Sequence, residues 1–370
     1  MFPCARKNIR VTAKRAPIRT PAEAAARALS MSTVTTWPRI PAVSSITAIH
    51  RMLTAKDKAI LQFFQDDFPL EARPFLFAAA RFGMSEAELI SRLKKLQVDG
   101  AIRYLGGIFD PKKLGVYSVL CAASVPEEKL AGVVRLINRI RGVSHNYLRS
   151  GDLNLWFTLS ARSGAAARKI ISALSRRAGQ KILQLPAIKT FKIDARFSLA
   201  GKRRAAVRRA PRSTTRPGDR ARIIRLNRPL PLASRPFKSL ARSLGSTEEK
   251  VISDIKGFLA AGLMRRFGLI LGHTRVGFKA NCMAAWRVPV KKIGSAARVF
   301  VGTSEITHCY LRRTAPGWPY NLYTMVHCSS RASCLRLLER ISRRARVKEY
   351  KALFTVREFK KTKADLASVL

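Results

Sequence analysis

Acidic residues are scarce in this sequence. Its 370 residues include 22 Asp and Glu against 71 Lys and Arg, which gives a formal net charge of +49. Such an excess favours an anionic partner, which could be nucleic acid, an acidic membrane surface or a polyanionic small molecule. Composition does not choose among these partners, and a solvated basic surface is a further interpretation.

Paired cysteines and long apolar runs are also missing. No CxxC pair occurs among the six cysteines, which argues against a zinc ribbon and a thioredoxin-type site, and six in 370 residues are too few for a dense disulfide scaffold. No run approaches the roughly 18 apolar residues of a membrane span, and no secretory signal is visible. We therefore expect a cytoplasmic protein without a membrane partner, whose cysteines are small buried hydrophobes. The cysteines are Cys4, Cys121, Cys282, Cys309, Cys328 and Cys334.

Two basic stretches divide the chain. Residues 1–50 carry eight Lys and Arg and a single acid, Glu23, so segment 1–51 is interpreted as a disordered tail or a start assigned too far upstream, with a transit peptide as the alternative. Segment 201–222 carries nine Lys and Arg and no apolar face, which predicts an exposed linker. Hydrophobic residues make up 47% of the chain, enough for a substantial core on each side of that linker.

The sequence contains an internal repeat. FPLEARPF at 68–75 recurs as LPLASRPF at 230–237, SHNYLR at 144–149 recurs as THCYLR at 307–312, and NLWFTL at 154–159 recurs as NLYTMV at 321–326. The offset rises only from 162 to 163 and then 167 residues. A unit of roughly 140 residues has therefore been duplicated and fused.

The start of each unit predicts a winged helix-turn-helix, at 52–115 and again at 223–277. Helical spacing indicates helices at 56–66, 74–82 and 86–98, the last with a capping box from Ser85 to Glu88. A strand at 102–109 and a turn at Asp110 predict a hairpin that forms the wing. Arg225 and Arg228 fall in the first helix region of the second unit, so that helix should be short or poorly packed.

The rest of each unit alternates strand, helix, strand, strand, helix, strand, the order of a ferredoxin-like fold. The predicted domains span 116–200 and 278–370, and the last strand of the first domain is placed at 188–197. We therefore predict an α+β protein, a tandem duplication of a winged helix-turn-helix and a ferredoxin-like βαββαβ domain.

The arrangement resembles the siroheme decarboxylases, a branch of the Lrp/AsnC superfamily, in its fused two-part form of heme d1 biosynthesis. The likeness rests on FPLEARPF, IRYLGGIF, SHNYLR and NLWFTL in the first half. In the second half it rests on LPLASRPF, MRRFGLILGH, GFKANCMAAWRVP, THCYLRRTAPGWPYNLYTMVH and REFKK. It covers residues 52–198 and 223–362. The resemblance implies that the two halves pair as a pseudo-dimer and that other heme-biosynthesis enzymes are possible partners.

The family's reaction converts siroheme to 12,18-didecarboxysiroheme by removing two acetate carboxyl groups, toward heme d1 or protoheme. The resemblance implies no required cofactor and no protein-bound metal, since siroheme carries its own iron. A polycarboxylate needs cationic partners as it loses its hydration, and arginine binds carboxylates best. The candidates for substrate binding are the wing residues Arg103, Arg265 and Arg266, together with Arg149, Arg312 and Arg313, which follow the two SHNY/THCY motifs.

Two histidines occupy the same position in the two repeats, His145 and His308, and the resemblance places the family's active-site histidine there. A methylene carbon that loses CO2 must take up a proton, and a histidine with a pKa near neutral is a suitable donor. Tyr310 is a candidate hydrogen-bond donor, and His273, after the second wing, is a candidate contact to iron or carboxylate. His327 is interpreted as structural.

The rival interpretation is a DNA-binding regulator, and a heme-sensing protein is a third. DNA readers place the start of the recognition helix in the major groove. Here those positions carry Glu86, Glu88, Glu248 and Glu249, which oppose attraction to phosphates. Specific DNA binding is therefore not the favoured prediction.

Overall fold

The computed structural model describes residues 53–194, 196, 199, 219–272 and 275–370. Segment 1–51 and most of segment 201–222 lie outside these residues. Residues 219–222 were predicted as linker but begin a helix, where the Asp219 carboxylate favours a helix N-terminus. No helix in the described part of the chain is long and apolar enough to cross a membrane.

Each repeat begins with three helices. In the first copy they are α2 (Ala55–Asp66), α3 (Pro74–Arg81) and α4 (Glu86–Val98); in the second they are α7 (Asp219–Leu226), α8 (Lys238–Ser243) and α9 (Glu248–Ala260). The predicted capping box forms, because the Ser85 side chain accepts from the Glu88 N–H and the Glu88 carboxylate accepts from the Ser85 N–H. The prediction of a short first helix in the second copy is confirmed, since α7 has 8 residues against 12 in α2.

The repeated RPF motif has a structural role in both copies. Arg73 forms an ion pair with Glu86, and Arg235 forms the equivalent pair with Glu248. Each pair joins the segment before the second helix to the first residue of the third helix. The apolar faces of all six helices then pack into one hydrophobic core that the two copies share.

The predicted wing hairpin is wrong. Strand β1 (Ile102–Phe109) pairs antiparallel with its counterpart β6 (Met264–Leu271) from the other repeat, with Gly106 opposite Gly268. The turn at Asp110 leads into a loop and then into the next domain. Two strands of almost identical pattern satisfy each other's backbone groups, so neither copy needs a second wing strand of its own.

Gly268 lies at a close approach between this two-stranded sheet and α2. Its φ is +150°, and a Cβ built there would lie 2.4 Å from the carbonyl oxygen of Phe64. We expect Gly268→Ala to lower the free energy of unfolding by at least about 2 kcal/mol, because the backbone must move to admit the methyl group. Urea-induced unfolding measures the effect.

Gly132→Ala is the matched control. Gly132 lies in helix α5 (Glu127–Asn138), and a Cβ there would meet no atom within 4 Å. Alanine is favoured over glycine in a helix by about 0.5–1 kcal/mol, so this variant should be as stable as the parent or more so. Equal stability of the two variants would contradict the close-approach interpretation.

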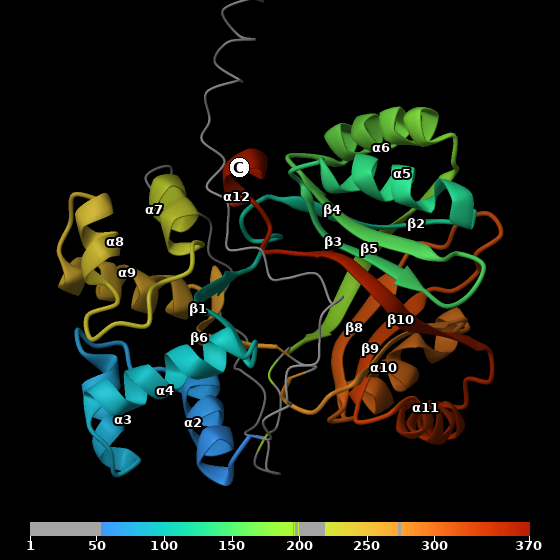
Figure 1. Cartoon of the computed structure of the whole chain (residues 1–370). Coiled ribbons are helices and arrows are strands. Elements are labelled where there is room, and N and C mark those ends of the chain that lie inside the picture. The colour runs from blue at the N-terminus through green and yellow to red at the C-terminus, as the bar shows by residue number, and fades with distance from the viewer. Residues whose placement is uncertain (1–52, 195, 197–198, 200–218, 273–274) are drawn as a thin grey trace, which may run out of the picture. The chain divides into compact units, whose positions relative to one another are not determined.

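Each repeat continues with the predicted βαββαβ order. The first copy comprises β2 (Tyr117–Ala123), α5, β3 (Val143–Arg149), β4 (Leu155–Ala161), α6 (Gly164–Ala178) and β5 (Ile182–Ile193). The second comprises β7 (Ala280–Trp286), α10 (Ile293–Val301), β8 (Ile306–Arg312), β9 (Leu322–Cys328), α11 (Arg331–Ala345) and β10 (Tyr350–Lys361), and α12 (Leu366–Val369) follows. A 3-10 turn at Val290–Lys292 precedes α10. Figure 1 shows α5 and α6 side by side over one sheet and α10 with α11 beside the other. The α+β duplication is thus confirmed.

The two sheets close into one barrel through their last strands. The order is β10-β3-β4-β2-β5-β8-β9-β7, so β5 leaves β2 and joins β8, while β10 leaves β7 and joins β3. Strand β5 therefore begins six residues before its predicted start. Pro186 lies within this added stretch and is the last residue paired with β2, where a missing N–H costs little. The halves pair with each other as predicted.

Candidate active site

The first histidine cluster lies on one face of strand β3. His145, Tyr147 and Arg149 alternate along the strand and so point the same way. The residue between the first two, Asn146, points to the helices, because its amide donates to the Asn138 side chain of α5 at 3.0 Å. The three side chains therefore face the interior of the barrel. Arg149 is buried, lies over the Tyr147 ring at 5.1 Å and donates to the Leu353 carbonyl of β10.

The second repeat builds the same cluster on β8. His308, Tyr310 and Arg312 alternate, and Cys309 between the first two packs in the core with the helices. The Arg312 guanidinium lies 4.8 Å from the Tyr310 ring centroid and donates to the Leu185 carbonyl of β5. Each arginine is thus held by the last strand of the other copy, at the point where the two sheets join.

The β1–β6 sheet adds one arginine beside each histidine. Arg103 donates to the Lys361 carbonyl at 2.8 Å, and its charge acts on His145. Its counterpart Arg265 acts on His308 and pairs with Asp110 at 3.1 Å. The charge of His308 also acts on His145, which indicates that the two clusters share one region of the interior.

Both histidines are neutral at pH 7 in this ligand-free state. Burial lowers the pKa of His145 to about 3, helped by the charges of Lys361, Arg103, His308 and Arg149. Burial and Arg265 lower the pKa of His308 to about 4, against an opposing effect of Asp194. The expected near-neutral pKa is therefore wrong for the free protein, because burial above all, and then the neighbouring cations, disfavour the charged ring. A bound polycarboxylate would oppose the effect of the cations.

A hydroxyl orients each imidazole ring. Ser144 Oγ lies 2.8 Å from Nδ1 of His145, and Thr307 Oγ1 lies 2.8 Å from Nδ1 of His308. In the second copy the chain of contacts continues, because Thr307 Oγ1 also lies 3.1 Å from Nε2 of buried His327. This places His327 in a hydrogen-bonded chain behind His308.

Other predicted residues lie apart from these clusters. Arg266 is turned toward the helices, where it approaches the carbonyls of Gln65 and Leu269. Arg313 is exposed, and its main-chain N–H donates to the Pro186 carbonyl. His273 lies outside the described residues.

Lys361 is the neighbour of His145 that the sequence analysis missed. It lies directly opposite His145 in the β10–β3 ladder. Burial is the main reason that its pKa falls to about 8, so it remains largely protonated at pH 7. Lys361 is the last residue of the REFKK motif. The motif alone does not show that Lys361 lies beside His145, because this position depends on the pairing of β10 with β3.

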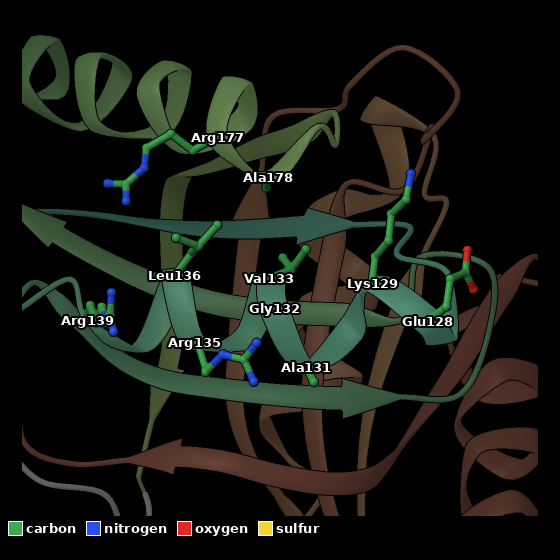
Figure 2. Close-up of a pocket in the computed structure, with 10 residues that line it drawn as sticks. All are labelled: Glu128, Lys129, Ala131, Gly132, Val133, Arg135, Leu136, Arg139, Arg177 and Ala178. Carbon is green, nitrogen blue, oxygen red and sulfur yellow. The ribbon is translucent and has the colours of Figure 1, made fainter.

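A cavity of about 490 Å³ lies on the helical side of the first sheet (Figure 2). Its lining residues are Glu128, Lys129, Ala131, Gly132, Val133, Arg135, Leu136, Arg139, Arg177 and Ala178. They belong to α5 and the end of α6, whereas His145 points to the opposite face of the same sheet. This cavity is therefore separate from the histidine clusters.

The acidic residues at the start of the third helices have structural partners. Glu86 and Glu248 form the ion pairs with Arg73 and Arg235, and Glu88 closes the capping box of its helix. Their negative charge remains at the face that a DNA reader would place in the groove. Within the described ranges, no group of three or more His, Cys, Asp or Glu residues could hold a metal ion.

Comparison with known protein families gives a match in each repeat for both of its domains. The family described as "AsnC-like ligand binding domain" matches residues 113–192 and 275–360. The family described as "Siroheme decarboxylase NirDL-like HTH domain" matches residues 57–103 and 219–265. Each family matches twice, as the internal repeat requires.

Whole-length relatives agree with these matches. The siroheme decarboxylase NirDL subunit of Paracoccus denitrificans is 36% identical over 318 residues, which cover 85% of this chain and 98% of the relative. The crystal structure of a siroheme decarboxylase NirDL superposes with a TM-score of 0.63 at 31% identity, over 84% of this chain and 93% of that one. A NirDL structure in complex with an iron-uroporphyrin III analogue superposes with a TM-score of 0.63 at 29% identity, over 84% and 94%.

Proposed function

The chain belongs to the siroheme decarboxylase family of carboxy-lyases, and from this we propose that it removes CO2 from two acetate side chains of siroheme to give 12,18-didecarboxysiroheme. The product would serve the synthesis of heme d1, or of protoheme by the alternative branch. The observation that carries the proposal is the pair of equivalent His, Tyr and Arg sets that face one barrel interior, each with a further arginine from the β1–β6 sheet.

The cations suit a polycarboxylate substrate. Arg149 and Arg312 are held in place by main-chain carbonyls, and the Nε atom of each is buried without a partner in the described structure. A buried guanidinium N–H without an acceptor favours an incoming carboxylate oxygen. Arg103 and Arg265 extend this arrangement from the neighbouring sheet.

The chemistry requires a proton at carbon. As the bond to the carboxyl carbon breaks, CO2 leaves and the electron pair remains on the methylene carbon, which must be protonated to give a methyl group. Siroheme carboxylates would raise the histidine pKa on binding, so that an imidazolium forms where the carbanion develops. The imidazole then regains a proton from water, and the tyrosine hydroxyls orient the acetate. We propose no cofactor beyond the iron that siroheme carries.

Anaerobic incubation of the purified full chain with siroheme, followed by mass spectrometry of the tetrapyrrole, tests the proposal. Loss of two CO2 units without an added cofactor is the expected result. Siroheme that binds but stays unchanged would favour a heme-sensing protein over an enzyme. Neither binding nor turnover, together with a sequence-specific DNA complex, would favour the regulator.

A further inference from the structure

Different residues are paired with the two histidines on the neighbouring strands. Lys361 of β10 lies opposite His145, whereas Ile193 of β5 occupies the equivalent place opposite His308. The two positions correspond because their neighbours make the same bonds: the N–H of Thr362 donates to the Ser144 carbonyl, and the N–H of Asp194 donates to the Thr307 carbonyl. One copy therefore has a cation where the other has an apolar side chain.

The surrounding charges enlarge this difference. Around His145 lie the cations Arg103, Arg149 and Lys361, and the carboxylate near them is Glu358, a 43% exposed side chain 3.4 Å from the Lys361 ammonium. Exposure to water weakens that pair. The region around His145 therefore carries excess positive charge and suits an ionised carboxylate.

Around His308 one cation has an acidic partner, since Arg265 is paired with Asp110. Asp194 also acts on His308 with a negative charge, and is itself ion-paired with Arg196. Lys192 donates to the carbonyls of Val301 and Thr303. Arg312 completes the charged groups that act on this ring.

The hydrogen-bonded chain behind the rings also differs. Thr307 links His308 to His327, whereas Ser160 occupies the position of His327 in the first copy and contacts the Ser118 hydroxyl at 3.0 Å. A second imidazole behind the first can hold the Thr307 hydroxyl in one orientation and so select the tautomer of His308. Only the His308 cluster has this support within the described residues.

We infer that the two halves have different tasks: the His145 cluster, with Lys361, anchors a siroheme carboxylate that does not react, and the His308 cluster carries the loss of CO2. The inference rests on the proposed function. A carboxylate gives up its negative charge as CO2 leaves, so cations that hold it tightly stabilise the ground state more than the transition state. The apolar Ile193 in place of a lysine, and the pairing of Arg265 with Asp110, reduce that cost at His308.

Lys361 is therefore a specificity-determining carboxylate ligand. The charges of Arg103 and Arg149 act on its ammonium, and burial strengthens its attraction to an anion. The two acetates would then react one after the other at the same place, and the tetrapyrrole would turn between the steps.

The test compares charge at the two equivalent positions. Lys361→Met keeps the length of the side chain, Lys361→Arg restores the charge, and Lys351→Met is the control, because Lys351 is exposed on the same strand and pairs with Ala285. Ile193→Lys adds the missing cation, with Ile193→Met as its uncharged control. Siroheme Kd is measured by absorbance titration and kcat by mass spectrometry, after thermal unfolding has verified each fold.

We expect Lys361→Met to raise the Kd for siroheme by about 10- to 100-fold and Lys361→Arg to restore binding. We expect Ile193→Lys to lower kcat by more than about tenfold and Ile193→Met to leave it near the parent. Binding by Lys361→Met equal to that of Lys351→Met, or an undiminished kcat in Ile193→Lys, would overturn the division of tasks. If Ile193→Lys does not fold, the Lys361 series decides the matter. A parent protein without turnover would instead refute the proposed function, which keeps the two failures distinct.

Discussion

His308→Ala is expected to lower kcat for siroheme decarboxylation by about 10²- to 10⁴-fold, the usual contribution of a positioned proton donor. The ring faces the barrel interior beside Tyr310 and Arg312, and Thr307 orients its Nδ1. With the ring removed, water must supply the proton to the methylene carbon that loses CO2, and this transfer is slower. Single-turnover experiments at saturating siroheme, followed by mass spectrometry, measure the effect.

His145→Ala is the matched comparison, because it removes the equivalent ring from the other repeat. That ring has the same kinds of contact, to a hydroxyl and to a tyrosine. If the two halves differ as inferred, His145→Ala weakens siroheme binding and changes kcat much less. Decarboxylation at the parent rate by His308→Ala would show that the second cluster does not supply the proton.

Stability of the ligand-free protein is expected to fall as the pH drops from about 6.5 toward about 4. In the unfolded chain both histidines take up a proton near their ordinary pKa. In the folded protein the pKa is about 4 for His308 and about 3 for His145, so both rings stay neutral to a lower pH. The unfolded state therefore binds more protons in this range, so the free energy of unfolding decreases with falling pH. At pH 4 the His308 contribution amounts to about 3 kcal/mol.

Urea-induced unfolding at pH 7 and pH 4, on the parent and on His145→Gln/His308→Gln, separates the histidines from other groups. Asp57 also loses stabilising interactions in acid, because hydrogen bonds from Arg92 and Thr54 outweigh its burial and lower its pKa. That effect is common to both proteins. A stability difference between them that is the same at both pH values would show that the histidines do not titrate as described.

The local features of this fold were predictable from the sequence. The Ser85 box begins its helix where predicted, and the SHNYLR motif lies in a strand of the predicted βαββαβ order. The repeat placed His145 and His308 at equivalent positions of the two copies. These predictions succeeded because they depend on residues close together in the chain.

The contacts between the two copies were not predictable in the same way. Nothing in the pattern of residues 102–109 states that their partner strand lies more than 150 residues away, and a local hairpin was the simpler expectation. The position of Lys361 opposite His145 depends on the exchange of last strands, with Pro186 at one of the crossing points. The lowered pKa of both histidines depends in turn on their burial inside the barrel that this exchange closes, and then on the neighbouring charges.

The covalent link between the copies has an evolutionary consequence. Two separate identical subunits would meet as a symmetric pair, and every mutation would appear on both sides of their common barrel at once. In a fused chain each half meets its partner at a high effective concentration that does not depend on how much protein the cell makes. A lysine at position 361 could therefore become established without a lysine at position 193, and an acid at 194 without one at 362. In the fused chain the two copies of the repeat can differ in sequence and still remain permanently paired.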